Sequence, residues 1–197
     1  MDFRDFPGET TRSIAFLSRI PVPDAMFGST PWKISGAVGV FPLAGIVIAL
    51  PAALLAALLI WLDIPSALTA ILTLLTMVLV TGALHEDGLA DCADAFGAGG
   101  PRERMLDILK DSRIGAYGTL AMIFSIALRG VALTVLIAIG PPLPMAVTLL
   151  SAAALSRALM VWHWRRLPAA RSDGVSASAG RPTPQSAWLA LSIGIGS

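Results

Sequence analysis

The residues of this chain that could do chemistry are concentrated between His85 and Gly118. This stretch holds seven of the thirteen carboxylates in the sequence, namely Glu86, Asp87, Asp91, Asp94, Glu103, Asp107 and Asp111. Its Leu and Ala content predicts a helix over residues 86–96, in which Asp87, Asp91 and Asp94 fall within about 60° of arc on one face. Like charges in one place repel one another at neutral pH, so we expect a divalent cation as the counter-charge.

That face predicts a metal site built from oxygen ligands. No cysteine pair or histidine cluster accompanies the aspartates, and all-oxygen ligation is typical of hard ions. We therefore predict that Asp87, Asp91 and Asp94 bind Mg2+, with Mn2+ as the alternative. Gly88 leaves the backbone beside Asp87 open to a ligand. The competing interpretation is a solvated acidic helix face, but three aspartates among eight positions favour the metal site.

The second half of the stretch, KDSRIGAYG, adds cations to this acidic region. Lys110 and Arg113 suit a phosphorylated substrate, because Arg offers a planar fork to phosphate oxygens and Lys offers a point charge. Ser112 and Gly115 keep the backbone small and accessible. Asp111 either completes the metal site or orients Lys110. The alternative is a set of membrane-interface anchors with ordinary ion pairing, but the neighbouring aspartates favour phosphate binding.

Three further residues are candidates for a role in or beside the site. Arg129 lies in the middle of an apolar segment, where a charge usually faces the bundle interior; it would pair with a substrate phosphate or a carboxylate, or be satisfied near Ser125. Arg157 lies nearer the end of its segment, from which its side chain can reach the interface. For both arginines a functional and a structural role are equally favoured. His85 points away from the acidic face, which favours a substrate contact over metal ligation.

The elements that must position these residues are long apolar segments. Hydrophobic residues make up 55% of the 197 positions and charged residues only 14%, and the mean hydropathy is +0.76. These values identify an integral membrane protein. The single cysteine, Cys92, cannot form an intrachain disulfide, and its place among the aspartates indicates reducing, cytosolic exposure. Nucleic acid is excluded as a partner, because no basic or aromatic patch forms.

We predict an all-α fold, a polytopic transmembrane helical bundle that forms a single domain over residues 1–197. Residues 1–33 are cytoplasmic or interfacial, with a short surface helix over residues 9–20. Spans are predicted at 34–62, 66–84, 116–139 and 145–164. The first is longer than a hydrocarbon core of about 30 Å requires, so we expect tilt or a break at Pro42 or Pro51. A fifth apolar run begins at Ala187 and ends with the chain, so we expect truncation partway through a helix.

The distribution of Lys and Arg predicts the orientation. The segments 1–33, 85–115 and 165–184 hold four each of the fourteen Lys and Arg residues, and the two short opposite turns hold none. The positive-inside rule therefore places the N-terminus and both polar loops in the cytoplasm. Arg171, Asp173 and Gly174 of the second loop would then form a further wall of the site.

HEDGLADCADAFGAGG followed by KDSRIGAYG resembles the paired signatures of the cobalamin synthases, also called adenosylcobinamide-GDP ribazoletransferases. The similarity extends to FLSRIPVP, FPLAGIVIAL and SRALMVWHWRRLPAARSDG, and so covers most of the chain. The positions that match the family motifs are His85, Asp87, Gly88, Asp91, Asp94, Lys110, Asp111, Ser112, Arg113 and Gly115. Glu86 departs from the pattern, in which an apolar residue is usual. Family members continue beyond the end of this chain.

The resemblance implies a Mg2+-dependent step of cobalamin synthesis in the bacterial cytoplasmic membrane. A hydroxyl of α-ribazole, or of its 5′-phosphate, would attack the phosphate of adenosylcobinamide-GDP that bears cobinamide, and GMP would leave. The three aspartates would hold the metal on the diphosphate, while Lys110 and Arg113 stabilise the transferred group. The proton acceptor would be one of the aspartates or Asp111. The resemblance leaves open whether the protein forms a homo-oligomer.

Three other functions remain as alternatives. A CDP-alcohol phosphotransferase would show an Ala-Arg pair after its Asp-Gly, and a prenyltransferase would show a second Asp-rich motif; the sequence has neither. A transporter would need ionisable residues along a path across the bilayer, and only Arg129 qualifies.

Overall fold

The computed structural model describes residues 5–27, 33–170 and 173–197, and within these ranges its regular structure is helical, without a strand. The order is α1 (Phe6–Leu17), η2 (Asp24–Phe27), α2 (Ile34–Ala37), η3 (Val38–Val40), α3 (Phe41–Trp61), α4 (Ser66–Thr81), α5 (Leu84–Ala98), α6 (Arg102–Ile108), α7 (Ala116–Ile139), α8 (Pro142–Arg166), α9 (Val175–Ala179) and α10 (Pro184–Gly196). The predicted all-α fold class is confirmed.

Three segments of the described chain are long and apolar enough to cross a membrane by themselves. They are Ile34–Trp61, α7 and α8, with 28, 24 and 25 residues. α4 and α5 meet the same criterion only as a pair, bent by 87° at their junction. The protein is therefore a multi-pass membrane protein. The third predicted span, 116–139, has the bounds of α7, and the fourth is longer at both ends than 145–164.

The first span is broken close to one of the two prolines at which we expected a break. The 3-10 turn η3 separates α2 from α3, and Pro42 follows in the first turn of α3, where its missing N–H has no helical partner to lose. Pro51 lies inside α3, which continues through it. Gly45 lets α3 approach α8, because an added Cβ would lie 2.9 Å from the Ala153 carbonyl oxygen.

The predicted second span, 66–84, ends early at a sharp corner. Gly82 and Ala83 both adopt left-handed backbone conformations, with φ of 63° and 59°, and this ends α4 at Thr81. The Ala83 N–H donates to the Val78 carbonyl at 2.9 Å and so satisfies one of the last free carbonyls of α4. The chain then begins α5 at Leu84. The helix that the sequence predicted over residues 86–96 is present, but it leaves the direction of the span.

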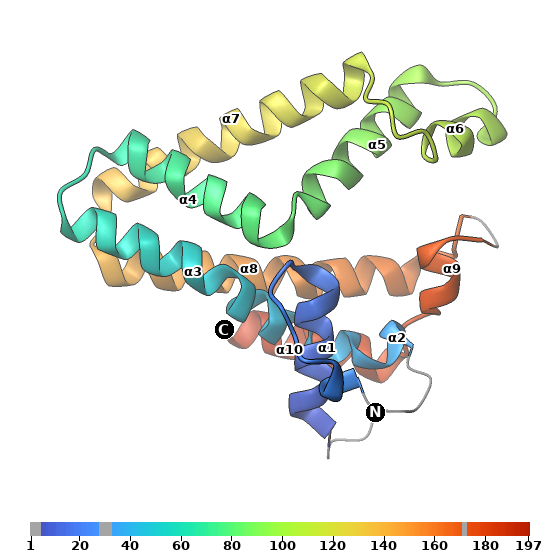
Figure 1. Cartoon of the computed structure of the whole chain (residues 1–197), viewed down its shortest axis with the longest axis horizontal. Helices are drawn as coiled ribbons and strands as arrows, with labels where there is room; N and C mark the ends of the chain where they lie inside the picture. Colours follow the sequence, from blue (N-terminus) through green and yellow to red (C-terminus); the bar gives the residue numbers. More distant parts are fainter. Residues whose placement is uncertain (1–4, 28–32, 171–172) are drawn as a thin grey trace.

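Two buried clusters hold the bundle together. The first joins α1, α3, α8 and α10 through Leu17, Phe41, Val161 and Ala190, and the second joins α3, α4, α7 and α8 through Ala56, Leu74, Ile137 and Leu149. Figure 1 shows α3 and α8 side by side, with α4 and α7 on one side of them and α10 on the other. α5 and α6 extend from the end of α4 as a separate arm that packs along the first part of α7.

The first helix differs from the predicted surface helix over residues 9–20. α1 ends at Leu17, before Pro21 and Pro23, and packs against α3. Leu17 and Ser13 are almost fully buried in that contact. The Arg19 N–H then donates to the Val80 carbonyl at 2.8 Å, which fastens the chain after α1 to the end of α4. α1 is thus part of the bundle and lies beside the corner between α4 and α5.

Candidate active site

α5 carries the three aspartates that the sequence predicted to share a face. Asp87 is exposed, Asp91 is half-buried, and Asp94 is buried with 9% of its surface exposed. The acidic face therefore runs from solvent at the first turn of α5 into the contact between α5 and α7. The three positions have different surroundings, although their spacing is regular.

Asp94 connects α5 to the beginning of α7. Its Oδ2 accepts the Gly115 N–H at 2.7 Å and its Oδ1 accepts the Gly118 N–H at 2.8 Å. Amides in the first turn of a helix have no acceptor within that helix, so the Asp94 carboxylate caps α7. Its negative charge also interacts favourably with the positive end of the α7 dipole. Both glycines are needed for this approach, since a Cβ at Gly115 or Gly118 would lie 2.4 or 2.3 Å from an Asp94 oxygen. Gly115, predicted to leave room for substrate, leaves room for Asp94.

The metal ligand set predicted from the sequence, Asp87, Asp91 and Asp94, stays a prediction, and the structure shows different surroundings for its three members. In the ranges that the structure describes, no group of three or more His, Cys, Asp or Glu side chains is placed to hold a metal ion. The sequence grouped Asp94 with Asp87 and Asp91, whereas its two oxygens already accept backbone amides. Asp87 and Asp91 remain, one helical turn apart, and nothing lies within 4 Å of where a Cβ on Gly88 would be. Two carboxylates fit Mg2+, which usually takes its other ligands from water and substrate phosphates.

A polar cavity of about 410 Å³ opens beside Asp87 at the corner between α4 and α5. It is lined by Phe16, Ser18, Arg19, Thr81, Gly82, Ala83, Leu84 and Asp87. Arg19 lies close against Gly82, where an added Cβ would come within 2.3 Å of its Nε. Sequence reasoning missed Arg19 as a site residue. Its place in FLSRIPVP was the signal that could have identified it.

The loop between α6 and α7 holds the predicted phosphate-binding cations. Lys110 Nζ lies 3.2 Å from Asp173 Oδ2, and Arg113 donates through Nε and Nη2 to the Asp111 carboxylate at distances of 2.6–3.0 Å. Asp111 therefore orients Arg113 rather than Lys110. The hydrogen bonds from Arg113 lower the pKa of Asp111 to about 2. The Arg113 side chain is 87% exposed and Ser112 is exposed beside it, so both can reach a ligand from solvent.

The same loop region contacts the segment that follows α8. Besides the pair formed by Lys110 and Asp173, Arg102 Nη2 of α6 donates to the Ala170 carbonyl. These contacts support the prediction that the second polar loop lies against the site. Gly174, also predicted there, has a φ of 93° and directly precedes α9. Arg171 lies outside the described residues.

A second group of polar side chains lies on the other side of α5. Arg129 Nη2 of α7 lies 2.9 Å from Glu86 Oε1, and its Nε donates to the Ser125 carbonyl at 3.3 Å. Arg157 Nη2 of α8 lies 2.9 Å from Nε2 of His85, which faces away from the aspartates as predicted. Of the three partners foreseen for Arg129, the structure contains two, a carboxylate and Ser125. Sequence reasoning left Glu86 out of the site, and only its position beside His85 and Asp87 could have suggested it.

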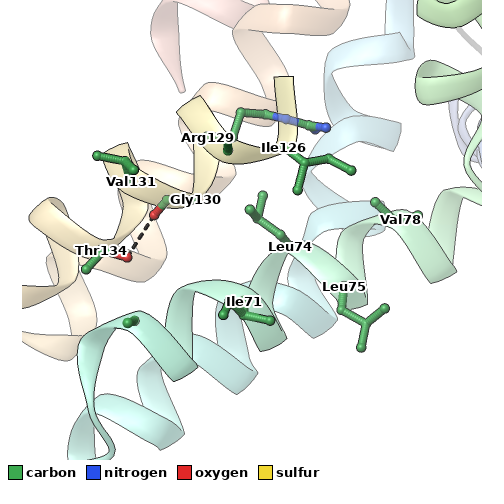
Figure 2. Close-up of a pocket in the computed structure, with 11 residues that line it drawn as sticks. Ile71, Leu74, Leu75, Val78, Ile126, Arg129, Gly130, Val131 and Thr134 are labelled. Carbon is green, nitrogen blue, oxygen red and sulfur yellow. Dashed lines mark hydrogen bonds between the residues drawn. The ribbon is translucent and has the colours of Figure 1, made fainter. Parts of the chain in front are cut away.

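A large apolar cavity of about 540 Å³ lies between α4 and α7. Figure 2 shows its aliphatic lining, including Ile71, Leu75 and Val131, with the Arg129 side chain pointing away from Ile71 and Leu75. The Thr134 hydroxyl is not free, because it donates to the Gly130 carbonyl at 2.8 Å. Apart from Arg129 and Thr134, the residues that line this cavity offer apolar surface suited to a hydrocarbon environment.

Comparisons with known proteins give a consistent result. A family model described as cobalamin-5-phosphate synthase matches residues 10–196. The chain is 52% identical to an adenosylcobinamide-GDP ribazoletransferase of Sinorhizobium medicae over 194 residues, which cover 98% of this chain and 74% of that protein. The identity is 50% with the protein of the same name from Rhizobium meliloti, over 98% and 74% of the two chains, and 46% with that of Azorhizobium caulinodans, over 92% and 69%. No solved structure matches the chain.

Proposed function

The chain belongs to the cobalamin-5-phosphate synthase family, and we propose that it carries out its transfer reaction on the exposed part of the α5 face, at Asp87 and Asp91. It is an enzyme of cobalamin synthesis. It transfers the phosphocobinamide group of adenosylcobinamide-GDP to a hydroxyl of α-ribazole or of its 5′-phosphate, and releases GMP. Cobalamin or its 5′-phosphate is the product.

The observation that carries the location is the pair of carboxylates beside a polar cavity at the corner between α4 and α5. Asp87 lines that cavity together with Arg19, and Asp91 follows one turn later on the same helix. A diphosphate is bound by cationic side chains, which donate to its oxygens, and by a metal ion that carboxylates hold. This corner supplies both kinds of group within one site.

The contacts of each residue indicate its role in the proposed reaction. Asp87 and Asp91 would hold Mg2+, which when bound stabilises negative charge on phosphate oxygens. Arg113, exposed at the end of its loop, donates to the oxygens of the transferred group and is held in place by Asp111. Asp94 fixes the start of α7, and with it the loop, relative to α5.

One of the two α5 carboxylates accepts the proton of the attacking hydroxyl. Asp111 is the weaker candidate, because a pKa of about 2 makes a carboxylate a poor base at neutral pH. Asp87 and Asp91 lie on the face that holds the diphosphate, and neither is paired with an arginine or a lysine in the described residues.

The enzyme works, in this proposal, at the cytoplasmic face of the bacterial inner membrane. The Lys and Arg residues outside the spans lie in the N-terminal segment and in the two polar loops, which favours a cytoplasmic position for all three. α5 and α9 lie toward the opposite end of the bundle from the turns that follow α3 and α7 (Figure 1). Nucleotide-linked substrates would then reach the site from the cytoplasm.

Asp91→Asn tests the proposal. We expect release of GMP from adenosylcobinamide-GDP to require Mg2+ in the wild type and to fall by at least about a hundredfold in the variant, because a metal-binding carboxylate is lost. Asp107→Asn, an exposed position on α6 outside the site, is the matched control and should retain turnover. Gel filtration in detergent checks that both variants are folded. Turnover near the wild-type rate in folded Asp91→Asn would remove Asp91 from the mechanism.

A further inference from the structure

A second polar site lies between helices of the bundle, separate from the aspartate face. It is a cavity of about 350 Å³ between α4, α5, α7 and α8, and its polar wall consists of His85, Arg129, Ser156 and Arg157. Met77 and Met160 belong to its apolar wall. We refer to it as the arginine cavity. Its role is not explained by the transfer site at Asp87 and Asp91.

Arg157 is the most buried cation of this cavity, with 7% of its surface exposed. It lies about 22 Å along α8 from Pro142 and about 14 Å from Arg166, at 1.5 Å per residue. This position falls within the length of helix that crosses the hydrocarbon core. A charged side chain there is costly, and it usually faces a polar cavity and serves a function.

The hydrogen bonds of Arg157 leave it without an anion. Its Nη1 donates to the Ser156 hydroxyl at 3.0 Å, and its Nη2 lies 2.9 Å from His85 Nε2. A guanidinium can only donate, so Nε2 must accept and His85 is neutral while this bond exists. The buried Nε has no hydrogen-bond partner. No carboxylate in the described residues forms an ion pair with Arg157.

The other arginine of the cavity already has a carboxylate. Glu86 Oε1 lies 2.9 Å from Arg129 Nη2, while Glu86 Oε2 is buried without a hydrogen-bond partner. Glu86 attracts Arg157 electrostatically as well, but from beyond ion-pair distance. Two arginines and one carboxylate leave one positive charge in excess when His85 is neutral. The cavity therefore has both an excess of charge and an unused donor.

We propose that the arginine cavity binds a phosphate ester anion, whose oxygens accept hydrogen bonds from Arg157 and Arg129. A phosphate offers several acceptors at once, which matches the unused Arg157 Nε and the donors that Arg129 keeps beyond its bond to Glu86. The cavity is larger than a phosphate group, so the apolar wall contacts the organic part of the ligand. A substrate and a phospholipid headgroup carry the same chemistry; that a substrate is the source rests on the proposed function.

Direct binding is measured on the purified full chain in detergent, with inorganic phosphate and GMP as the probes, by isothermal titration calorimetry. Loss of a buried charged donor lowers the affinity for a hydrogen-bonded anion by about tenfold or more. We expect this decrease in affinity in Arg157→Gln. Arg166→Gln is the matched control from the same helix, because the Arg166 guanidinium lies over the Trp162 ring, outside the cavity. It should bind both probes as the wild type does.

Glu86→Gln distinguishes a ligand site from an internal ion-pair network. Removing the carboxylate raises the excess positive charge of the cavity, so we expect GMP and phosphate to bind several-fold more tightly than to the wild type. A purely structural network would instead lose stability and show no gain in affinity. Arg157→Lys keeps the charge, so it provides a second variant if Arg157→Gln does not fold, and its affinity should fall between those of the wild type and a variant without the charge.

The source of the phosphate is settled by two further arms. Native mass spectrometry shows whether an anionic phospholipid remains bound to the wild type and is lost from Arg157→Gln, and the GMP titration is repeated with added phosphatidylglycerol. Retained lipid that competes with GMP identifies the headgroup as the ligand, whereas GMP binding that requires Arg157 and that lipid does not change identifies the substrate. If neither lipid nor phosphate nor GMP depends on Arg157, the proposal is overturned.

The failure of this proposal and the failure of the proposed function give different results. Absence of turnover in the wild type, together with phosphate binding that requires Arg157, would overturn the function and retain the cavity. Normal turnover, with the same KM and the same GMP affinity in the wild type and in Arg157→Gln, would retain the function and overturn the cavity as a ligand site.

Discussion

The Asp94 carboxylate has contacts that its spacing in the sequence did not suggest. Helical spacing placed it on one face with Asp87 and Asp91, and the helix formed as predicted. The start of α7 supplies two backbone amide donors to Asp94. Within the described residues, no such pair of amide bonds is seen for Asp87 or Asp91. Spacing identifies the side chains that share a face, but the partner of each depends on elements that are distant in the sequence.

Asp94→Asn should therefore act on stability first. An amide presents one oxygen and an NH2 group, so one of the two N–H donors loses its acceptor, at a cost of about 1–3 kcal/mol if it is the buried donor. We expect a lower thermal midpoint in detergent, while the Mg2+ concentration for half-maximal activity stays close to that of the wild type. Thermal unfolding and a Mg2+ titration of turnover check this. An unchanged midpoint with a much higher Mg2+ requirement would instead make Asp94 a metal ligand.

Asp111 leads to a prediction about pH. Hydrogen bonds from Arg113 hold the pKa of Asp111 at about 2, below its usual range, so the pair is fully formed above about pH 5 and is lost only as the pH falls through about 2. Asp111 thus carries its charge across the whole range in which the enzyme can be assayed. We expect Asp111→Asn to leave the acidic limb of the kcat profile at the same pH. A shifted or missing limb would identify Asp111 as the base.

At the scale of elements, the contact between α5 and α7 depends on glycine. Gly118 lies where a Cβ would meet Asp94 Oδ2 at 2.3 Å and the Ala90 carbonyl oxygen at 2.9 Å, whereas Gly88 faces open space. The sequence presents both simply as glycines in a motif. Only the packing shows that one is required for helix approach and that the other leaves room for something outside the chain.

Gly118→Ala and Gly88→Ala form a matched pair of variants. The added methyl group in Gly118→Ala must separate α5 from α7, and overpacking of this kind costs about 1–3 kcal/mol. We expect a lower thermal midpoint and reduced turnover. Gly88→Ala should fold at least as well as the wild type, because Ala favours a helix, and should raise the KM for adenosylcobinamide-GDP. Equal midpoints for the two variants would contradict this division of roles.

The elements also show what the sequence could predict. The α7 span and the helix of the acidic motif follow from uninterrupted apolar length and from helix-forming composition, which are local properties. The 87° corner was not predicted, because Ala83 gives no sign of a left-handed backbone. The burial of α1 was also missed, since its helical pattern suits a membrane surface and a protein partner equally well.

At the scale of the whole molecule, the bundle and the arm have different kinds of contact. α3, α8 and α10 pack through small residues, as where Gly194 approaches Ala158, while the far end of the arm is joined to the segment after α8 by polar contacts from Arg102 and Lys110. Such exposed contacts contribute little each, typically less than about 1 kcal/mol. The end of the arm is therefore held more weakly than its base.

Cys92 offers a test of how the whole molecule is oriented. It is the only cysteine of the sequence, and it is exposed on α5 next to Asp91. A membrane-impermeant, charged maleimide should label it in inverted membrane vesicles and not in intact cells. Leu62→Cys in a Cys92→Ser background, in the short turn after α3, should show the opposite pattern. Labelling of Cys92 from outside intact cells would reverse the proposed orientation.

The left-handed alanine at the corner has a consequence for how the enzyme moves. Ala83 holds a φ of 59°, which glycine adopts freely but alanine adopts only at a cost of about 1 kcal/mol or more. The surrounding packing must outweigh this cost, because the strained backbone persists only where its neighbours hold it. We therefore expect closure around a substrate to come from the loop that carries Lys110 and Arg113, and not from bending where α4 meets α5.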